Sequence, residues 1–86
     1  MSLAQQKKRQ PLNGYEHLTV DPNYMGGRPA VIGRRITVEQ ILEGIAQGLT
    51  ADDYERHYHV PREAVFEAVK LAGEIASGRY RLAVAD

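Results

Sequence analysis

The strongest constraint on this fold is a helical hydrophobic period that runs from residue 37 to residue 78 and is interrupted twice by turn-forming residues. Its first stretch repeats apolar residues at i, i+3, i+4, i+7 and i+8, which places them on one helix face: Val38, Ile41, Leu42, Ile45 and Ala46. Thr37 with Gln40 fits a capping box at the start, and Gly48 can end the helix in a left-handed conformation. The pattern predicts a first helix at about 38–47.

A second, shorter helix is predicted after this turn. Thr50 can cap its start, and Asp52 and Asp53 then lie near the positive end of the helix dipole. Its inner face is short and aromatic, with Ala51, Tyr54 and Tyr58 at helical spacing. We expect this helix to end near residues 57–59.

The third predicted helix is the longest and covers about residues 61–76. Pro61 suits its first turn, where the missing N–H would have no partner in any case, and Gly78 closes it. One broad apolar arc follows this helix: Ala64, Val65, Ala68, Val69, Leu71, Ala72, Ile75 and Ala76. Phe66 and Gly73 lie together just outside the arc, which suggests a close contact with another element or subunit. The alternative is that Phe66 packs locally within its own domain.

The residues before the first helix carry strand and turn signals instead of a helical period. The stretch GYEHLTV at 14–20 is rich in β-branched and aromatic residues and predicts a short strand. A turn-rich stretch leads to a second apolar run at 30–32, so we expect a hairpin with a long loop. The chain then divides into a flexible basic arm at 1–13, one domain at 14–78, and a tail at 79–86. Residues 79–84 alternate enough to form an edge strand or to order on a partner.

Length and composition limit the remaining possibilities. A chain of 86 residues forms one small domain, and a homodimer would be a natural way to complete its core. The sequence has no cysteine, which excludes disulfides and thiolate chemistry. It also lacks an apolar run near the roughly 18 residues of a membrane span, and its start lacks the apolar stretch of a signal peptide. We therefore expect a cytoplasmic protein with no membrane partner.

The net charge of zero conceals a division along the chain. Residues 1–36 contain six basic and two acidic residues, a balance of +4, whereas residues 37–86 contain five basic and nine acidic residues, a balance of −4. Such a division can direct a basic surface at phosphate and leave an acidic surface for a protein. The alternative is that the charged side chains form an ordinary solvated surface and are divided in this way by chance.

The sequence gives little support for a catalytic function. His57 and His59 are two residues apart and diverge on a helix, so metal binding and a metal-dependent enzyme are the weakest interpretation. Asp52 and Asp53 are better explained by the helix dipole than as an acid–base pair. We predict no enzymatic activity, no metal site and no cofactor.

Two short helices followed by a longer third helix outline a helix-turn-helix unit, which binds DNA with its third helix. The third helix is a poor reader of DNA here, because Glu63 and Glu67 repel phosphate. The better candidates for phosphate contact are the arginines of the basic half. The predicted nucleic-acid-binding residues are Arg28, Arg34 and Arg35, with Arg62 and Lys70 secondary.

The stretch Gly26-Gly27-Arg28-Pro29-Ala30-Val31-Ile32-Gly33-Arg34-Arg35-Ile36-Thr37-Val38 resembles the characteristic motif of the family called domain of unknown function 433. Gln47-Gly48-Leu49-Thr50 and Tyr58 fit the downstream part, and the likeness covers about residues 15–76. Two positions depart from the family pattern. Arg34 stands where the family usually has Thr, and Pro61 where a capping Ser or Thr is common.

The resemblance implies a mainly α fold: a three-helix, homeodomain-like helix-turn-helix bundle with a short N-terminal β-hairpin. It further implies a small prokaryotic antitoxin that dimerises, binds operator DNA and neutralises a PIN-like nuclease toxin. Arg28 and Arg35 match the family's basic positions. The residues expected to bind a partner are Phe66, Gly73, Arg79, Tyr80, Arg81 and Leu82. The alternative is a protein-interaction or assembly module that binds no nucleic acid.

Overall fold

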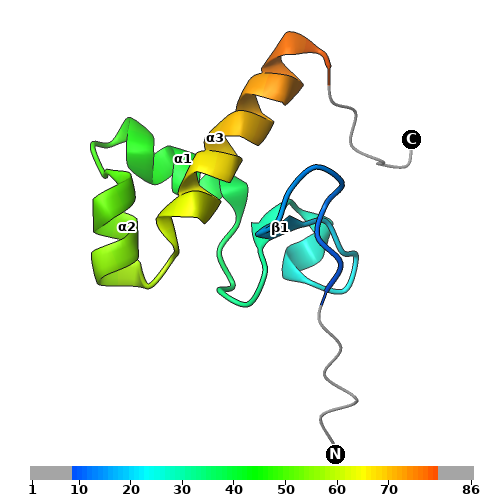
Figure 1. The fold of residues 1–86 in the computed structure, drawn as a ribbon, viewed down its shortest axis with the longest axis horizontal. Coiled ribbons are helices and arrows are strands. Elements are labelled where there is room, and N and C mark those ends of the chain that lie inside the picture. Colours follow the sequence, from blue (N-terminus) through cyan, green and yellow to red (C-terminus); the bar gives the residue numbers. More distant parts are fainter. Residues whose placement is uncertain (1–8, 80–86) are drawn as a thin grey trace, which may run out of the picture.

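The structure, a computed structural model, describes residues 9–79. Within this range the chain forms three helices and one two-stranded antiparallel sheet (Figure 1). The elements are β1 (Leu18–Thr19), the 3-10 turn η2 (Met25–Gly27), β2 (Ala30–Val31), α1 (Val38–Ala46), α2 (Ala51–Tyr58) and α3 (Arg62–Ser77). The predicted mainly α, three-helix fold with an N-terminal hairpin is confirmed. Among these helices, none combines the length and the hydrophobicity that crossing a membrane requires.

The hairpin is shorter than the predicted strands at 14–20 and 30–32. β1 pairs with β2 in the register Leu18 opposite Val31 and Thr19 opposite Ala30. The backbone N–H groups of residues 16 and 17 donate to a side chain of α3 instead of to a neighbouring strand. Because a side chain takes these donors, regular pairing begins only at Leu18.

The long hairpin loop is held by the buried Tyr24. Its hydroxyl donates to the Val31 carbonyl at 2.8 Å and accepts from the Arg35 backbone N–H at 2.9 Å. Gly26 and Gly27 have φ angles of 68° and 80°, which a glycine adopts without steric cost. Tyr24 therefore connects the hairpin loop to β2 and to the residues that follow it.

Residues 9–13 fold back onto the hairpin, although the sequence assigns them to the flexible arm. The Leu12 backbone N–H donates to the Leu18 carbonyl at 2.7 Å, and the Leu12 side chain packs against the core. The Thr19 hydroxyl donates to the Gln10 carbonyl at 2.7 Å. The Arg9 guanidinium lies 4.0 Å from the centre of the Tyr24 ring. The folded body thus begins before residue 14.

The helix ends agree closely with the capping signals. Thr37 with Gln40 forms a capping box at α1, and Thr50 with Asp53 forms a second one at α2. α2 ends at Tyr58, and its C-cap, His59, has a left-handed φ of 59°. α3 begins at Arg62, with Pro61 as its N-cap instead of the first helical residue.

The core lies where the three helices meet the hairpin. Its fully buried members come from every part of the fold and include Leu18, Val31, Ile41, Val60, Val65 and Leu71. Gly44 is essential to the contact between α1 and α2, because a Cβ at this position would lie 1.9 Å from the Tyr54 hydroxyl oxygen. Tyr54 is itself buried, and its hydroxyl donates to the Ile41 carbonyl at 3.2 Å.

Only half of the predicted apolar arc of α3 is buried. The buried members are Ala64, Val65, Ala68 and Leu71. Val69 and Ile75 are instead 48% and 43% exposed. Val69 is exposed because of its side of the helix, since Leu71, which lies further along α3, is fully buried. Ile75 is exposed because α3 has 16 residues, whereas α1 has nine and α2 eight, so the end of α3 extends past its neighbours (Figure 1).

Candidate functional site

The connection between β2 and α1, residues 33–36, carries the two adjacent arginines and is called the arginine loop below. Arg34 donates from Nε to the His59 carbonyl at 2.6 Å, which fastens the loop to the end of α2. Arg35 has a left-handed φ of 52°. Both side chains are exposed, and that of Arg35 forms no ion pair with any residue between 9 and 79. Arg34 also forms no ion pair with the described residues, because its partner is a neutral carbonyl. The loop therefore presents two unneutralised cations, of which Arg34 is anchored.

Arg28, the third main candidate, faces α1. Its guanidinium lies 2.8 Å from a Glu39 carboxylate oxygen, and both side chains are about two-thirds exposed, at 65% and 67%. An ion pair this exposed contributes little stability, because solvent screens it. The Glu39 carboxylate nevertheless competes with a phosphate for the Arg28 guanidinium.

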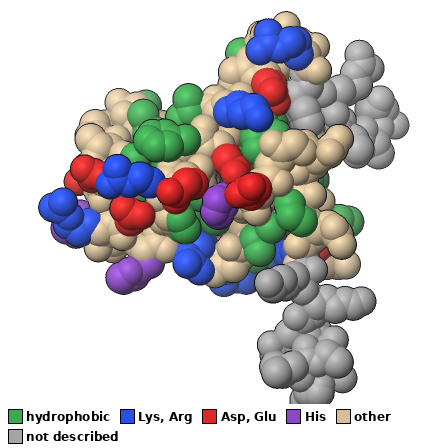
Figure 2. Space-filling model, viewed as in Figure 1, with side chains coloured by type: hydrophobic (Ala, Val, Ile, Leu, Met, Phe, Trp, Pro, Cys, Tyr) green, Lys and Arg blue, Asp and Glu red, His purple; other side chains and the backbone are tan. Residues whose placement is uncertain are grey.

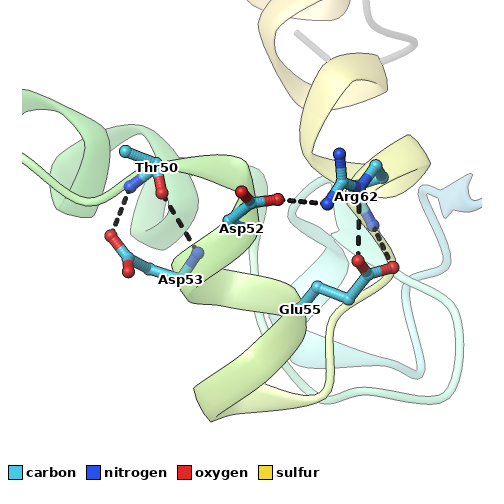
Figure 3. Close-up of polar contacts among 5 residues, drawn as sticks. All are labelled: Thr50, Asp52, Asp53, Glu55 and Arg62. Carbon is cyan, nitrogen blue, oxygen red and sulfur yellow. Dashed lines mark hydrogen bonds and ion pairs between the residues drawn. The ribbon is translucent and has the colours of Figure 1, made fainter.

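Arg62 forms a clamp between α3 and α2 (Figure 3). Its Nε lies 3.2 Å from a Glu55 carboxylate oxygen, and a terminal nitrogen contacts the Asp52 carboxylate. The hydrogen bond to Glu55 and the charge of Asp52 raise the pKa of Arg62 above its usual value. Two carboxylates therefore contact the single guanidinium of Arg62 at the start of α3. In a helix-turn-helix protein, this position should contact DNA.

Lys70 is directed at the N-terminal segment. Its ammonium lies 4.7 Å from the centre of the Tyr15 ring, a cation–π distance. One turn further along α3, Glu74 accepts a hydrogen bond of 2.6 Å from the Tyr15 hydroxyl. Lys70 and Glu74 thus both contact Tyr15 and hold it against α3.

Glu67 completes this polar contact with the hairpin. Its carboxylate accepts from the backbone N–H groups of Glu16, at 3.1 Å, and His17, at 2.9 Å, and His17 Nδ1 lies 3.0 Å away. Burial alone would raise the pKa of Glu67, but the bonds to His17 and Glu16 outweigh it and lower the pKa. The sequence predicts that Glu67 repels phosphate, whereas in the structure this carboxylate holds the hairpin.

A metal site requires several side-chain ligand atoms close to one another. Within residues 9–79, oxygen and nitrogen ligands of Glu16, His17 and Glu67 lie within 4.8 Å of one another. The Glu67 carboxylate already accepts two backbone N–H groups, which a cation would have to displace. The arrangement is explained by attachment of the hairpin, and we assign no metal to it.

The exposed side of α3 carries an uncharged surface, formed by Phe66, Val69 and Gly73 and called the apolar face below. Phe66 is 58% exposed and Val69 48% exposed. A Cβ built on Gly73 would meet no atom within 4 Å, so the space above this residue is open. The spacing i, i+3, i+7 puts all three on one side of the helix. The sequence singles out Phe66 and Gly73 and places Val69 in the apolar arc of α3.

The remaining residues predicted to bind a partner belong to the tail. Arg79 is exposed, and its backbone N–H donates to the Glu74 carbonyl at 3.0 Å. Tyr80, Arg81 and Leu82 lie outside the described residues.

The five predicted nucleic-acid-binding residues thus have different local roles. Four of them contact other parts of the fold: Arg28 contacts α1, Arg34 the end of α2, Arg62 the α2 carboxylates, and Lys70 the Tyr15 ring. On the face shown in Figure 2, basic and acidic side chains are interspersed, and hydrophobic side chains lie between them. The described surface offers a mixed charge pattern together with an exposed apolar face.

The fold defines a small three-helix domain whose N-terminal hairpin is attached by side chains of α3. The family model described as "Protein of unknown function (DUF433)" matches residues 18–72, and the chain belongs to this family. The match includes the glycine-arginine motif, α1, α2 and most of α3. Comparisons with curated proteins and with solved structures found no match.

Proposed function

We propose that this chain is a cytoplasmic, antitoxin-type regulatory protein that acts by binding a protein partner through the apolar face of α3. The observation that carries the proposal is the exposure of Phe66 and Val69 on a helix whose first basic residue, Arg62, is already paired with two carboxylates. A DNA-reading helix would need the reverse pattern, with free cations and few exposed apolar side chains.

The chemistry of the apolar face suits a protein. Exposed aromatic side chains are frequent anchors of protein interfaces, because they bury a large area at little conformational cost. Gly73 lies beside Phe66 on this face and has open space above it, which lets a partner approach the helix backbone closely. A partner side chain can therefore sit over Gly73 while Phe66 enters a pocket of the partner.

The resemblance to the antitoxin-like family indicates which partner to test first, a small PIN-like nuclease from the same genome. Residues 37–86 carry a charge balance of −4. A nuclease must attract the phosphates of its substrate, so a protein with an acidic surface is electrostatically suited to bind it.

The test is calorimetric titration of the purified nuclease with the full chain and with Phe66→Ser and Val69→Ser. We expect each substitution to weaken binding by at least about tenfold, since residues that anchor an interface contribute about 2 kcal/mol or more. Ile75→Ser is the matched control, because it removes a comparably exposed apolar side chain from another side of α3. Unchanged affinity for Phe66→Ser, or an equal loss for Ile75→Ser, would contradict the proposal.

A second candidate function, operator binding as a homodimer, is favoured by the arginine loop. Arg34 and Arg35 are adjacent and exposed, and α2, the connection at 59–61 and α3 follow the order of a helix-turn-helix unit. Binding should then fall steeply with salt, and Arg34→Ala and Arg35→Ala should each reduce the salt slope by about 1.

Fluorescence anisotropy with the chain's own upstream DNA, over a range of salt concentrations, measures these slopes. Arg56→Ala removes an exposed cation from α2 and serves as the control, with the slope expected to stay unchanged. If the wild-type chain shows no association at low salt, DNA binding is wrong and the protein-binding function stands alone.

A further inference from the structure

A groove runs between α1 and the C-terminal half of α3, apart from the apolar face. Its volume is about 720 Å³, within the range of about 300–1,000 Å³ that is usual for binding pockets. Both helices contribute to its apolar lining, which consists of Val38, Leu42, Leu71, Ala72, Ile75 and Ala76. Leu42 and Ala72 are half-buried and Ile75 is 43% exposed, so the described residues leave this apolar surface accessible. An apolar hollow of this size on so small a domain indicates a binding surface.

One rim of the groove is acidic. Glu39 and Glu43 lie one helical turn apart on α1 and border the apolar lining. Arg28 also borders the groove and pairs with Glu39 at 2.8 Å. Glu43 is exposed and forms no ion pair with the described part of the chain. The rim therefore keeps a net negative charge, which is complementary to an occupant with basic side chains.

The walls of the groove decide which backbone conformation an occupant can have. Both walls are helices, so their backbone N–H and C=O groups are bonded within α1 and α3. An extended peptide between them would find no strand to pair with, and its own backbone groups would lose water without gaining a partner. A helix satisfies its backbone groups internally and presents only side chains. The groove is therefore suited to a helical occupant.

The dimensions of the groove also fit a helix. Apolar side chains at i, i+4 and i+7 span about 10.5 Å along a helix, and the nine residues of α1 measure about 13.5 Å. Ala72 and Ala76 lie one turn apart on the α3 wall, and their short side chains allow an occupant to approach closely. Two turns of an amphipathic helix can thus lie along the groove.

We propose that the α1–α3 groove binds an amphipathic helix of another protein, with apolar side chains against Leu42, Ala72 and Ile75 and a basic side chain beside Glu43. This proposal does not rest on the proposed function, which uses Phe66, Val69 and Gly73 on a different side of α3. The domain can then hold two proteins at once, one on each side of this helix.

The test uses a designed peptide as the probe. It is a fluorescein-labelled peptide of about 16 residues, mostly alanine, with leucines at i, i+4 and i+7 and lysines along one flank of the leucines. Fluorescence anisotropy with the full chain should show saturable binding. Ile75→Asp should weaken it by at least about tenfold, because it places a charge in the apolar lining. Phe66→Asp, which adds the same charge on the apolar face, should leave the affinity unchanged.

A charge exchange tests the acidic rim. Glu43→Lys should weaken binding of the lysine peptide by about threefold or more and should strengthen binding of a peptide with glutamates in place of the lysines. Glu63→Lys makes the same change of charge at an exposed position outside the groove and should alter neither affinity.

Three results would overturn the proposal. The first is that the lysine peptide does not bind the wild-type chain. The second is that Phe66→Asp weakens binding as much as Ile75→Asp, which would move the peptide to the apolar face. The third is a wild-type dimer in sedimentation that Ile75→Asp converts to a monomer, which would show that a second copy fills the groove. Loss of nuclease binding by Phe66→Ser with intact peptide binding separates this proposal from the proposed function.

Discussion

Two sides of α3 use their side chains in opposite ways. On one side, Glu67, Lys70 and Glu74 are charged, and each of them contacts the N-terminal segment around Tyr15 and His17. On the other, the apolar face of Phe66, Val69 and Gly73 is left uncovered. A third side, formed by Ala64, Val65, Ala68 and Leu71, is apolar and buried as expected; the first two sides differ from the usual rule that charges face solvent and apolar residues face the protein.

The difference shows how a very small domain attaches a hairpin to a helix. The sheet has only two residues in each strand, so it offers few apolar side chains for packing. Hydrogen bonds from the backbone N–H groups of Glu16 and His17 to the Glu67 carboxylate, and from the Tyr15 hydroxyl to Glu74, supply the missing attachment. The helix keeps an apolar surface for other contacts. The predictions below test whether the two sides differ in this way.

The largest effect should follow from removing the Glu67 carboxylate. Glu67→Ala leaves the N–H groups of Glu16 and His17 without their acceptor, and the Glu67 side chain is only 17% exposed. We expect a loss of about 2–3 kcal/mol in the free energy of unfolding, as for hydrogen bonds to charged groups. Urea unfolding followed by circular dichroism measures it. Glu63→Ala, an exposed glutamate one turn earlier, should change stability by less than about 0.5 kcal/mol; equal losses would remove the distinction between the two sides.

A smaller effect should distinguish a covered glycine from an uncovered one. At Gly44 an added methyl group meets the Tyr54 hydroxyl and ring, so Gly44→Ala should destabilise by about 1–2 kcal/mol despite the better helix propensity of alanine. At Gly73, on the apolar face, nothing lies within 4 Å, and Gly73→Ala should stabilise by about 0.5–1 kcal/mol. Thermal unfolding of the two variants checks the opposite signs. Destabilisation by Gly73→Ala would mean that this face is covered in the isolated protein.

The smallest effect should be a pH dependence carried by the charged side of α3. The hydrogen bonds of Glu67 lower its pKa below the ordinary value of 4.5. Its contribution is therefore complete above pH 4.5 and is lost as the pH falls through the lowered pKa of the folded state. Stability of the wild-type chain should fall more steeply below pH 4.5 than that of Glu67→Gln, in urea titrations at several pH values. Parallel curves would show that Glu67 ionisation does not support the hairpin.

Local signals in the sequence predict the helices well, because their ends are determined by nearby residues. Thr37 with Gln40 and Thr50 with its partner three residues later are capping boxes that need no distant contact. The extent of the hairpin could not be predicted in the same way. Strand length depends on Glu67, about 50 residues away in the sequence, which takes the N–H groups of residues 16 and 17.

The candidate site was harder to predict than the fold. Sequence identified the basic residues, but their partners are side chains and carbonyls from other elements, as with Arg62 between Asp52 and Glu55. Helical periodicity placed Val69 in the apolar arc of α3, because it shows which residues share a broad side and not where the buried part of that side ends. Phe66 and Gly73 were recognisable, since a large side chain near a glycine at helical spacing is a local pattern.

The hydroxyl of Tyr24 has a consequence for how this domain can vary. It bonds to Val31 and to Arg35 at once, and so it fixes the number of residues that can separate them. An inserted or deleted residue between these two positions would break one bond and shift the arginine loop relative to α1. We therefore expect this short stretch to resist changes of length.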